Sequence, residues 1–367
     1  MKIAVYLEGN SWGEVGPEAL LSGLGGRESA AVYLSECFGD MGHEVHVFCP
    51  HETTKMYPRE NGGSTTYVHH EMGVPMISSF PYDAILSWES PDIFLVPGVR
   101  ENCKALVCGM QVAHFTSDEE AVAAPDCWVA LSPWHAKFME SQAPGVMRRV
   151  EVMPNCVDLT KFEKRDPLQP VGKHKQFVYT SSPDRGLIHV LEAWPALREE
   201  FPGAVLHVAY GIENWSESVF WGHSQVSEMA VNVTRLLEQD GVIYHGRIGH
   251  AEVAALHGVS DALLYPCDTL APTETGCITV IEACAGGNIP IITDCDCLKT
   301  EFSGVAEIVP LPWNEETYVR RVKSVLSDPE KIQRLREDGR AFAEQRQWPV
   351  VATQWISLFD ELKGTSC

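Results

Sequence analysis

The sequence predicts two α/β domains in tandem, each built around a parallel β-sheet. Short runs of residues that are apolar at nearly every position alternate with helical patterns, as expected for parallel strands buried on both faces. A polar stretch from Lys161 to Lys175 interrupts this alternation once. The chain has 367 residues, which is enough for two domains with separate cores.

The first domain is expected to begin with a strand, a helix and a second strand. Residues 2–7 form a β-rich apolar run, and apolar residues then recur at helical spacing from Ala30 to Met41, before Gly42 ends the helix. The second strand is Val45 to Phe48, and such a unit is typical of the right-handed crossover in a parallel sheet. The further strands expected in this domain are Tyr82–Ser87, Ala105–Val112, Cys127–Leu131 and Val150–Met153.

The second domain follows the linker and repeats the alternation. Helical patterns cover Leu187–Leu197 and Val226–Glu238, and the tail from about Glu316 to Leu362 is expected to be helical throughout. Trp348 and Trp355 lie on one face of that tail and are interpreted as core anchors. The expected strands are Gln176–Thr180, Val205–Tyr210, Val242–Tyr244, Ala262–Tyr265, Ile289–Ile292 and Glu307–Val309.

Charge and cysteine content narrow the functional classes. The 28 Lys and Arg against 50 Asp and Glu give a net charge of −22, which disfavours non-specific binding of nucleic acid. No apolar stretch approaches the roughly 20 residues of a membrane span, and the N-terminus lacks signal-peptide features, so a cytoplasmic location is expected. The 12 cysteines are then expected to be thiols, and their spacing does not match structural zinc, so no metal is predicted.

The first loop that could bind a ligand is Gly23-Leu24-Gly25-Gly26-Arg27-Glu28. In open parallel sheets ligands bind at the carboxyl ends of strands, and this loop leads into a helix whose amides and dipole favour an anion. Glu28 stands where the dinucleotide fingerprint requires glycine, which counts against a dehydrogenase. The alternative is a turn that only lets the helix pack closely.

A second loop, Thr180 to Gly186, lies between a strand and a helix. Arg185 is expected to project where that helix begins, and its guanidinium would add a charge-assisted contact to a phosphate. Alternatively, Ser or Asp caps the helix and Arg185 is solvated. The residues alone leave both interpretations open.

The strongest candidate is the segment around Glu274 and Glu282. Glu282 stands in an apolar helical pattern, and an unpaired buried carboxylate is costly, so it is expected to accept hydrogen bonds from ligand hydroxyls. Glu274 precedes that helix, where residues 275–278 would offer free amides to an anion. Together these features indicate a ligand with hydroxyls and phosphate, such as a nucleotide sugar.

Five segments, in this order, resemble the retaining glycosyltransferases of family 4, which have the GT-B fold. They are Gly25–Glu28, Gly42–Val45, Pro154–Asp158, the Glu274 and Glu282 pair with seven residues between, and Ala283–Ile292. The resemblance covers nearly the whole chain and implies two Rossmann-like domains facing across a cleft. It implies an acceptor-side domain over residues 1–160, a nucleotide-sugar domain over 161–345, and a helix at about 346–365 that crosses back to the first.

The resemblance implies transfer of a hexosyl or pentosyl group from a UDP- or GDP-sugar, with retention at the anomeric carbon and without metal or cofactor. It assigns catalysis to Glu274, Arg185 and His114. The residues expected to bind the donor are Glu282, Thr275, Gly276, Cys277, Ile278, Ser182, Arg247, Gly25 and Gly26. The family's second phosphate-binding arginine is absent near Thr180, and Arg247 is expected to replace it. Asp294-Cys295-Asp296 mimics a metal-binding DxD motif, and we interpret that likeness as coincidence.

Other functions remain open at this point. One is a sugar-nucleotide epimerase with the same fold, and another is a binding or scaffold protein with a degenerate site. The expected acceptor is a glycan, a lipid or another hydroxyl compound, with at most peripheral membrane contact. The basic residues Lys161, Lys164, Arg165, Lys173 and Lys175 either meet an anionic acceptor, such as a lipid phosphate or modified DNA, or form a solvated linker.

Overall fold

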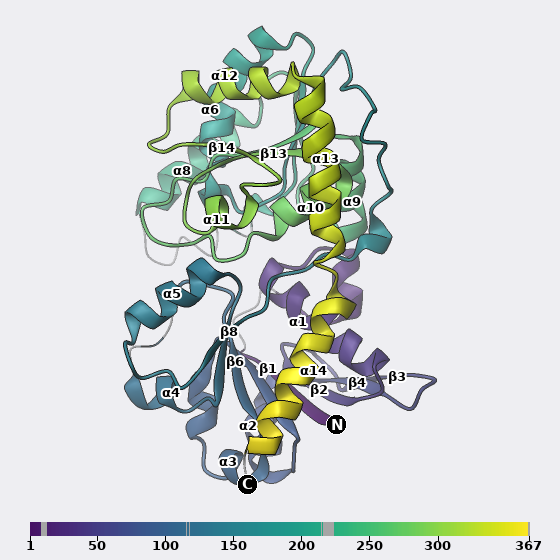
Figure 1. The fold of residues 1–367 in the computed structure, drawn as a ribbon, viewed down its shortest axis with the longest axis vertical. Coiled ribbons are helices and arrows are strands. Elements are labelled where there is room, and N and C mark those ends of the chain that lie inside the picture. The colour runs from purple at the N-terminus through teal and green to yellow at the C-terminus, as the bar shows by residue number, and fades with distance from the viewer. Residues whose placement is uncertain (9–12, 115, 117, 214, 216–223, 366–367) are drawn as a thin grey trace.

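The protein folds into two α/β halves, which lie one above the other in Figure 1. The computed structural model describes residues 1–8, 13–114, 116, 118–213, 215 and 224–365. Each half contains its own sheet, and each sheet has a buried apolar core of its own. Within the described residues, no helix combines the length and apolarity that crossing a bilayer would require.

The sheet of the first half has the strand order β3-β4-β2-β1-β5-β6-β7-β8. Neighbouring strands are parallel except for the antiparallel pair β3 and β4. The strands are β1 (Lys2–Leu7), β2 (Glu44–Cys49), β3 (Lys55–Pro58), β4 (Ser64–His69), β5 (Ala84–Trp88), β6 (Leu106–Gly109), β7 (Cys127–Ala130) and β8 (Val150–Val152). The β3 and β4 strands were not expected from the sequence, because β3 is largely exposed and β4 is rich in polar residues.

Alternating side chains of β1 enter two different cores. Ile3, Val5 and Leu7 pack on one face of the sheet, whereas Ala4 packs on the other. This explains why the strand is apolar at nearly every position. The helices of this half are α1 (Gly26–Asp40), α2 (Gly73–Ser79), α3 (Val99–Asn102), α4 (Glu119–Ala123) and α5 (Pro133–Gln142), with 3-10 turns η1 (Pro17–Leu21), η2 (His70–Met72), η3 (Pro91–Leu95) and η4 (Leu159–Lys161).

The second half is an all-parallel sheet with the order β11-β10-β9-β12-β13-β14. Its strands match the expected segments to within two residues at each end: β9 (Gln176–Tyr179), β10 (Val205–Val208), β11 (Val242–Tyr244), β12 (Ala262–Tyr265), β13 (Ile289–Thr293) and β14 (Glu307–Val309). The 3-10 turn η5 (Pro183–Arg185) and the helices α6 (Leu187–Glu200), α8 (Ser224–Leu236), α9 (His250–Val259), α10 (Ile278–Gly286) and α11 (Leu298–Phe302) connect them.

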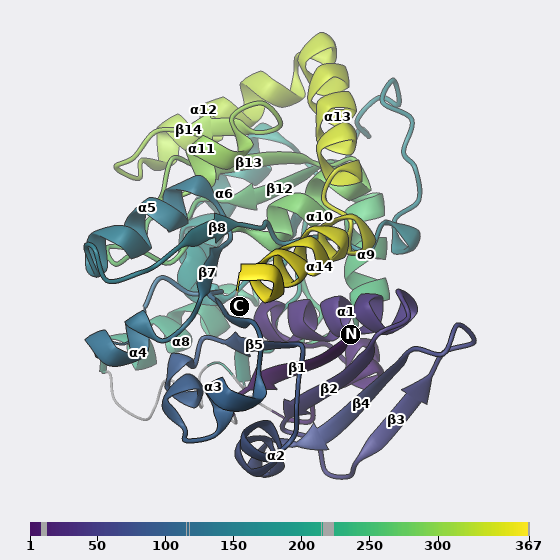
Figure 2. The same cartoon turned by 60° about the horizontal axis from the view of Figure 1, so that its bottom comes forward.

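The C-terminal tail consists of three helices rather than the continuous helix expected from the sequence. They are α12 (Glu315–Leu326), α13 (Pro329–Glu344) and α14 (Trp348–Thr365). The first break falls where Asp328 caps the next helix and Pro329 begins it, which is a strong helix-start signal. The α14 helix leaves the second half and packs along α1 of the first (Figures 1 and 2). Trp348 and Trp355 are buried there, as predicted.

The chain crosses between the halves at two adjacent places. Outward, it passes through Val157, and on its return it passes through Arg346 and Gln347. The Val157 amide donates to the Arg346 carbonyl at 2.8 Å, and Val157 forms an isolated parallel bridge with Gln347. The two crossing segments are therefore hydrogen-bonded to each other.

Candidate active site

Each sheet adds strands outward from its centre in both directions, and the two central points open onto one cleft. In the second half this point lies between β9 and β12, and in the first half between β1 and β5. Loops diverge at such points and leave room for a ligand beyond the carboxyl ends of the strands. The cleft has a volume of about 990 Å³ and is lined by residues of both halves.

Arg185 follows β9. The sequence predicted that it projects where a helix begins, but in the structure it projects from a turn just before that helix. It is the last residue of the 3-10 turn η5, and Gly186 then takes a left-handed φ of 93° before α6 begins at Leu187. A Cβ atom on Gly186 would lie 2.2 Å from the Pro266 carbonyl oxygen. Glycine is therefore required, both for the turn and for its close approach to the loop after β12.

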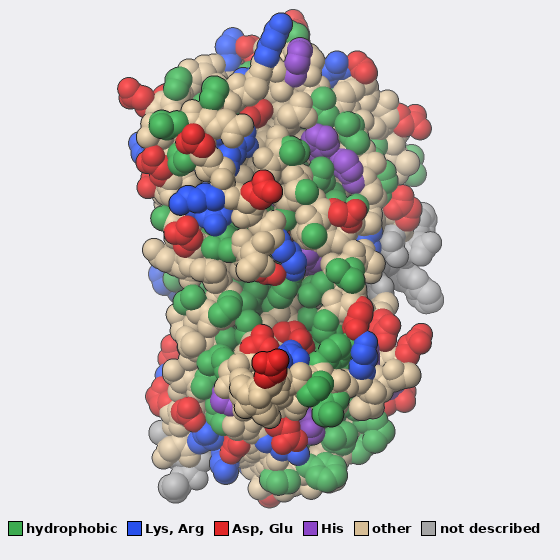
Figure 3. All heavy atoms as spheres, turned by 90° about the vertical axis from the view of Figure 1, so that its right-hand side faces the viewer, with side chains coloured by type: hydrophobic (Ala, Val, Ile, Leu, Met, Phe, Trp, Pro, Cys, Tyr) green, Lys and Arg blue, Asp and Glu red, His purple; other side chains and the backbone are tan. Residues whose placement is uncertain are grey.

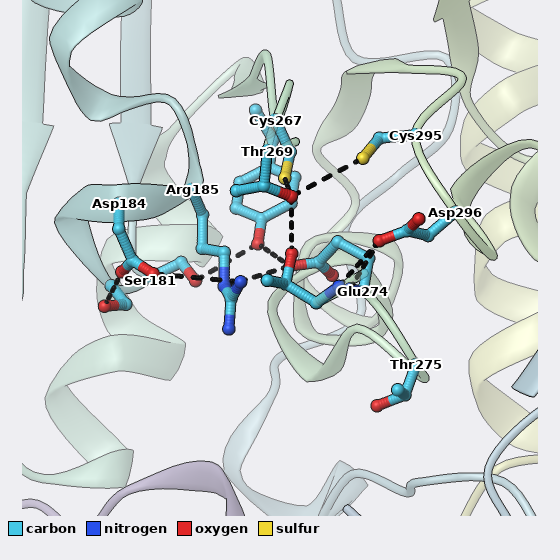
Figure 4. A network of polar contacts seen from close by, with 12 residues as sticks. Ser181, Asp184, Arg185, Cys267, Thr269, Glu274, Thr275, Cys295 and Asp296 are labelled. Atoms are coloured by element: carbon cyan, nitrogen blue, oxygen red, sulfur yellow. Dashed lines mark hydrogen bonds and ion pairs between the residues drawn. The ribbon is translucent and has the colours of Figure 1, made fainter. Parts of the chain in front are cut away.

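The Arg185 side chain points toward Glu274, which lies in the loop after β12 (Figure 4). Arg185 Nε is 3.4 Å from Glu274 Oε1, and the Tyr265 hydroxyl donates to the same oxygen at 2.7 Å. Asp184 Oδ2 is 3.7 Å from Arg185 Nη1. The candidate phosphate-binding cation and the first glutamate of the pair thus meet at one point of the cleft.

Burial and charge act in opposition on this ion pair. Burial raises the pKa of Glu274, which is 5% exposed, while the Arg185 guanidinium acts to lower it. Burial alone would lower the pKa of Arg185, but the carboxylates of Glu274 and Asp184 outweigh that effect, so the pKa is raised. Arg185 therefore remains a cation while it lies in a largely desolvated place.

The backbone of the Glu274 loop is held by a carboxylate. Asp296 Oδ2 accepts hydrogen bonds from the amides of Thr273 and Glu274, at 2.8 and 3.0 Å. Asp294 Oδ1 accepts from the Leu311 amide at 2.8 Å. Both carboxylates of the DxD-like sequence therefore bind backbone amides and hold loops in place.

The first half also holds this loop. The Ser132 hydroxyl donates to the Thr275 carbonyl, the Thr275 hydroxyl donates to the Gln111 carbonyl, and the Asn155 amide donates to the Gly276 carbonyl, each at 2.8 Å. The segment that carries Glu274 is thereby fixed from both sides of the cleft.

The halves approach each other closely at Gly276. A Cβ atom there would lie 2.6 Å from Leu131 Cβ, so only glycine fits. The α10 helix then begins at Ile278 after Cys277, and no side chain caps its N-terminus. Residues 275–278 line the cleft, so the start of this helix lies at its edge without a side-chain cap.

Glu282 lies in α10 and lines the same cleft. Its side chain is half-buried, and within the described part of the chain no group forms a hydrogen bond with its carboxylate. Burial raises the pKa of Glu282 to about 7, although the charge of Lys161 acts to lower it. The carboxylate expected to await a ligand is therefore present and has no hydrogen-bond partner of its own.

The glycine-rich loop places α1 against the cleft from the first half. Gly25 caps α1, and both Gly25 and Gly26 line the cleft, as expected. Arg27 also lines it, and Arg27 Nε is 3.1 Å from Glu89 Oε2 at the end of β5. Glu89 has a left-handed φ of 68°, which is uncommon for a residue other than glycine. This ion pair was not anticipated from the sequence.

Ser182 and Arg247 lie where the sequence predicted, whereas His114 does not reach the cleft. The first two line the cleft, and Arg247 Nε donates to the Gly23 carbonyl across it at 2.9 Å. His114 is exposed and lies outside the lining, because β6 ends at Gly109, three residues before the expected strand end. Gln111 lines the cleft after this strand instead. Asn155, from the segment Pro154–Asp158 of the family resemblance, also lines the cleft, as do Tyr210 and Tyr265, which the sequence did not single out.

Two basic residues of the segment from Lys161 to Lys175 form ion pairs within the molecule. Lys161 bonds to the Tyr33 hydroxyl, and its Nζ lies 3.1 Å from Asp158 Oδ2. Arg165 Nη2 is 3.2 Å from Asp261 Oδ1, and this arginine side chain is 9% exposed. These contacts hold the linker against the folded halves, and they leave neither cation as a solvated group.

Comparison with known proteins places these features in a family context. Residues 161–342 match the family model of glycosyl transferases group 1. Similar solved structures are the sucrose-phosphate synthase of Thermosynechococcus elongatus (17% identity, 99% of each chain, TM-score 0.69) and a glycosyltransferase of Rickettsia africae (12%, 99% of each chain, 0.72). A third is Anabaena HepE in complex with UDP and glucose (14%, 98% of this chain and all of that one, 0.68). No curated protein matches the sequence significantly. The GT-B fold expected from the sequence is confirmed.

Proposed function

Since residues 161–342 match the family model of group 1 glycosyl transferases, we propose that this chain is a retaining glycosyltransferase of family 4 that uses a UDP- or GDP-sugar. The observation that carries the proposal is the Glu282 carboxylate, which lines the cleft without a hydrogen-bond partner in the described chain. A half-buried carboxylate in this position is suited to accept hydrogen bonds from the two ribose hydroxyls of a nucleotide. The UDP and glucose in the Anabaena structure support a UDP-sugar in particular.

The remaining contacts follow along the donor from the ribose. The diphosphate would lie at the uncapped N-terminus of α10 and beside Arg185, where amides and a guanidinium converge. Glu274 would accept hydrogen bonds from hydroxyls of the transferred sugar. Arg27, which pairs with Glu89, and Arg247, which bonds to the Gly23 carbonyl, line the cleft from opposite halves and would add positive charge near the diphosphate.

The chemistry requires stabilisation of a leaving group. When the bond from the anomeric carbon to the phosphate breaks, negative charge develops on the nucleoside diphosphate, and fixed cations and amides lower the energy of that state. Arg185 is already oriented by Glu274 before any ligand binds, so little reorganisation is needed. We propose that the reaction needs no metal, since this charge can be met by Arg185, by the helix amides and by the two further arginines.

The charge of the first half favours an acceptor without net negative charge. Of the charged residues that line the cleft from this half, Glu14, Glu18 and Glu28 are acidic and Arg27 is basic. Lys161 and Arg165 of the basic segment are engaged internally. On the face drawn in Figure 3, acidic and basic side chains are interspersed over both halves. A glycan or another uncharged hydroxyl compound therefore fits better than a lipid phosphate or DNA.

A donor screen tests the proposed function. The purified chain is mixed with UDP-glucose, UDP-N-acetylglucosamine, GDP-mannose and the free nucleotides, and both the melting temperature and the products formed without acceptor are measured. One donor is expected to raise the melting temperature and to be hydrolysed slowly. An epimerised donor would instead support the epimerase. If no nucleotide raises the melting temperature, the site is degenerate and the proposal is wrong.

The raised pKa of Glu282 predicts that donor binding weakens in acid. The ionised carboxylate accepts hydrogen bonds best, and with a pKa of about 7 it becomes protonated as the pH falls from 8 to 6. If only the ionised form binds, the dissociation constant rises about tenfold over this range. Calorimetry with the best donor of the screen measures this change. The Glu282→Gln variant is expected to bind more weakly at pH 8 and to show a flat profile; a wild-type profile that is equally flat would contradict the role of this group.

A further inference from the structure

Two cysteines lie side by side beneath the loop that carries Glu274. Cys267 follows β12 and Cys295 follows β13, and these neighbouring strands are paired in parallel with Tyr265 opposite Ile292. Both sulfur atoms lie 3.8 Å from the Thr269 hydroxyl oxygen (Figure 4). The Thr293 hydroxyl also bonds to the Cys267 carbonyl, which ties the two strand ends together.

The two thiols contact the same hydroxyl and differ in exposure and in the direction of their pKa shifts. A hydrogen bond from the Cys267 thiol lowers the pKa of Cys295, and the same bond, together with burial, raises the pKa of Cys267. Cys295 is 5% exposed, whereas Cys267 is fully buried. Cys295 is therefore the thiol that a small oxidant reaches and the one that more readily forms the reactive thiolate.

Both cysteines are connected to the backbone of Glu274. The Thr269 hydroxyl, which contacts both sulfurs, forms a 2.7 Å hydrogen bond with the Thr273 hydroxyl. On the other side, Asp296 directly follows Cys295 in the sequence, and its carboxylate accepts hydrogen bonds from the backbone amides of Thr273 and Glu274. Any movement of the two sulfurs is thereby transmitted to the loop that positions the Glu274 carboxylate beside Arg185.

We propose that Cys267 and Cys295 form a reversible redox modification site whose disulfide weakens binding of the sugar nucleotide. The sulfurs of a disulfide are roughly 2.05 Å apart, which is closer than two unbonded thiols approach, so closing the bond is expected to draw the two loops together. This effect on binding rests on the proposed function, whereas formation of the disulfide does not.

The oxidation balances with hydrogen peroxide as the two-electron oxidant. The Cys295 thiolate attacks one peroxide oxygen, becomes a sulfenic acid and releases hydroxide, which takes up the proton that the thiol had lost. The Cys267 sulfur then attacks the Cys295 sulfur, an S–S bond forms, and the hydroxyl group leaves with the Cys267 proton as water. In total, two thiols and one peroxide give one disulfide and two waters, and a dithiol reverses the reaction by exchange.

A second cysteine pair provides an internal control. The Glu274 charge raises the pKa of both Cys277 and Cys297, which places both thiols near this carboxylate. Cys277 is 7% exposed and Cys297 is fully buried, but for both thiols burial is the largest cause of a raised pKa, in contrast to the lowered pKa of Cys295. These two cysteines are therefore expected to stay reduced under conditions that oxidise Cys267 and Cys295.

The test treats the full chain with hydrogen peroxide, alkylates the remaining thiols and maps linked peptides by mass spectrometry. A Cys267–Cys295 linkage is expected in the wild type. This linkage should be absent from the Cys295→Ser and Cys267→Ser variants and present in Cys297→Ser. A Cys295→Ala variant and the melting temperature of each variant check that loss of the linkage is not caused by misfolding. Donor affinity should fall about tenfold on oxidation and recover with dithiothreitol, as expected when about one hydrogen bond to the donor is lost. A linkage at Cys277 and Cys297, no linkage, or a linkage that leaves the affinity unchanged would each overturn the proposal. Failure of every donor to bind, with the linkage present, would overturn the effect on binding together with the proposed function.

Discussion

Replacing Arg185 by alanine is expected to lower the turnover number for donor hydrolysis by about 10²- to 10³-fold, which is the usual cost of removing one preorganised charge from a developing anion. The guanidinium is held beside Glu274 at 3.4 Å and lines the cleft next to the start of α10. Its charge would act mainly on the departing diphosphate, so the Michaelis constant should change less than the turnover number. Steady-state kinetics with the donor of the screen measures both values.

The matched control for this variant is Arg198→Ala. Arg198 lies in the same half, is paired with Asp240 and is exposed to a similar degree, but it does not line the cleft. Its loss is expected to leave turnover within a factor of two. Full turnover in Arg185→Ala would remove the basis for placing the diphosphate beside this residue.

The second large effect is expected at Glu274. The Glu274→Gln variant keeps the shape of the side chain and can still accept the Tyr265 hydroxyl, but it offers Arg185 no charge and binds sugar hydroxyls more weakly. A fall of about 10- to 100-fold in kcat/KM is expected, which corresponds to the loss of a hydrogen bond to a charged group. Because Glu274 and Arg185 are in contact, combining this change with Arg185→Ala should cost less than the two single changes added together.

Glu301→Gln is the control for this second variant. Glu301 is likewise a poorly exposed carboxylate of the second half, and its Oε2 lies 3.2 Å from Arg346 Nη2, but it lies outside the cleft. The control is expected to lower the melting temperature without a comparable fall in kcat/KM. Strict additivity of the Arg185 and Glu274 changes would show that the two side chains act separately, against the arrangement in Figure 4.

Most strands of the second half were predictable from the sequence because they are buried on both faces. A strand such as β12 (Ala262–Tyr265) must be apolar at every position, which marks it clearly in the sequence. The β3 and β4 strands carry no such mark, since an edge strand with exposed residues resembles a loop. The breaks in the tail were missed for another reason. The helical pattern continues through Asp328 and Pro329, and this continuity hid the fact that a cap residue followed by proline marks the start of a new helix.

The candidate site was predictable only where a charged residue stood in a sequence context that rarely holds one. Glu282 in an apolar helix and Arg185 beside glycine and proline are visible in one sequence. The pairing of Arg27 with Glu89, by contrast, joins residues more than sixty positions apart and depends on the strand order of the sheet. His114 was misplaced in the sequence interpretation because the length of β6 could not be read to within three residues.

The two adjacent crossings at Val157 and Arg346 suggest how the halves of related proteins can be exchanged. Since the whole second half is inserted between two hydrogen-bonded points, its exchange for that of a relative would need only two junctions, which are adjacent in space. The α14 helix would stay with the half on which it packs, so both cores would remain intact. If the proposed function holds, a chimaera built at these joints is expected to combine one protein's choice of donor with another's choice of acceptor.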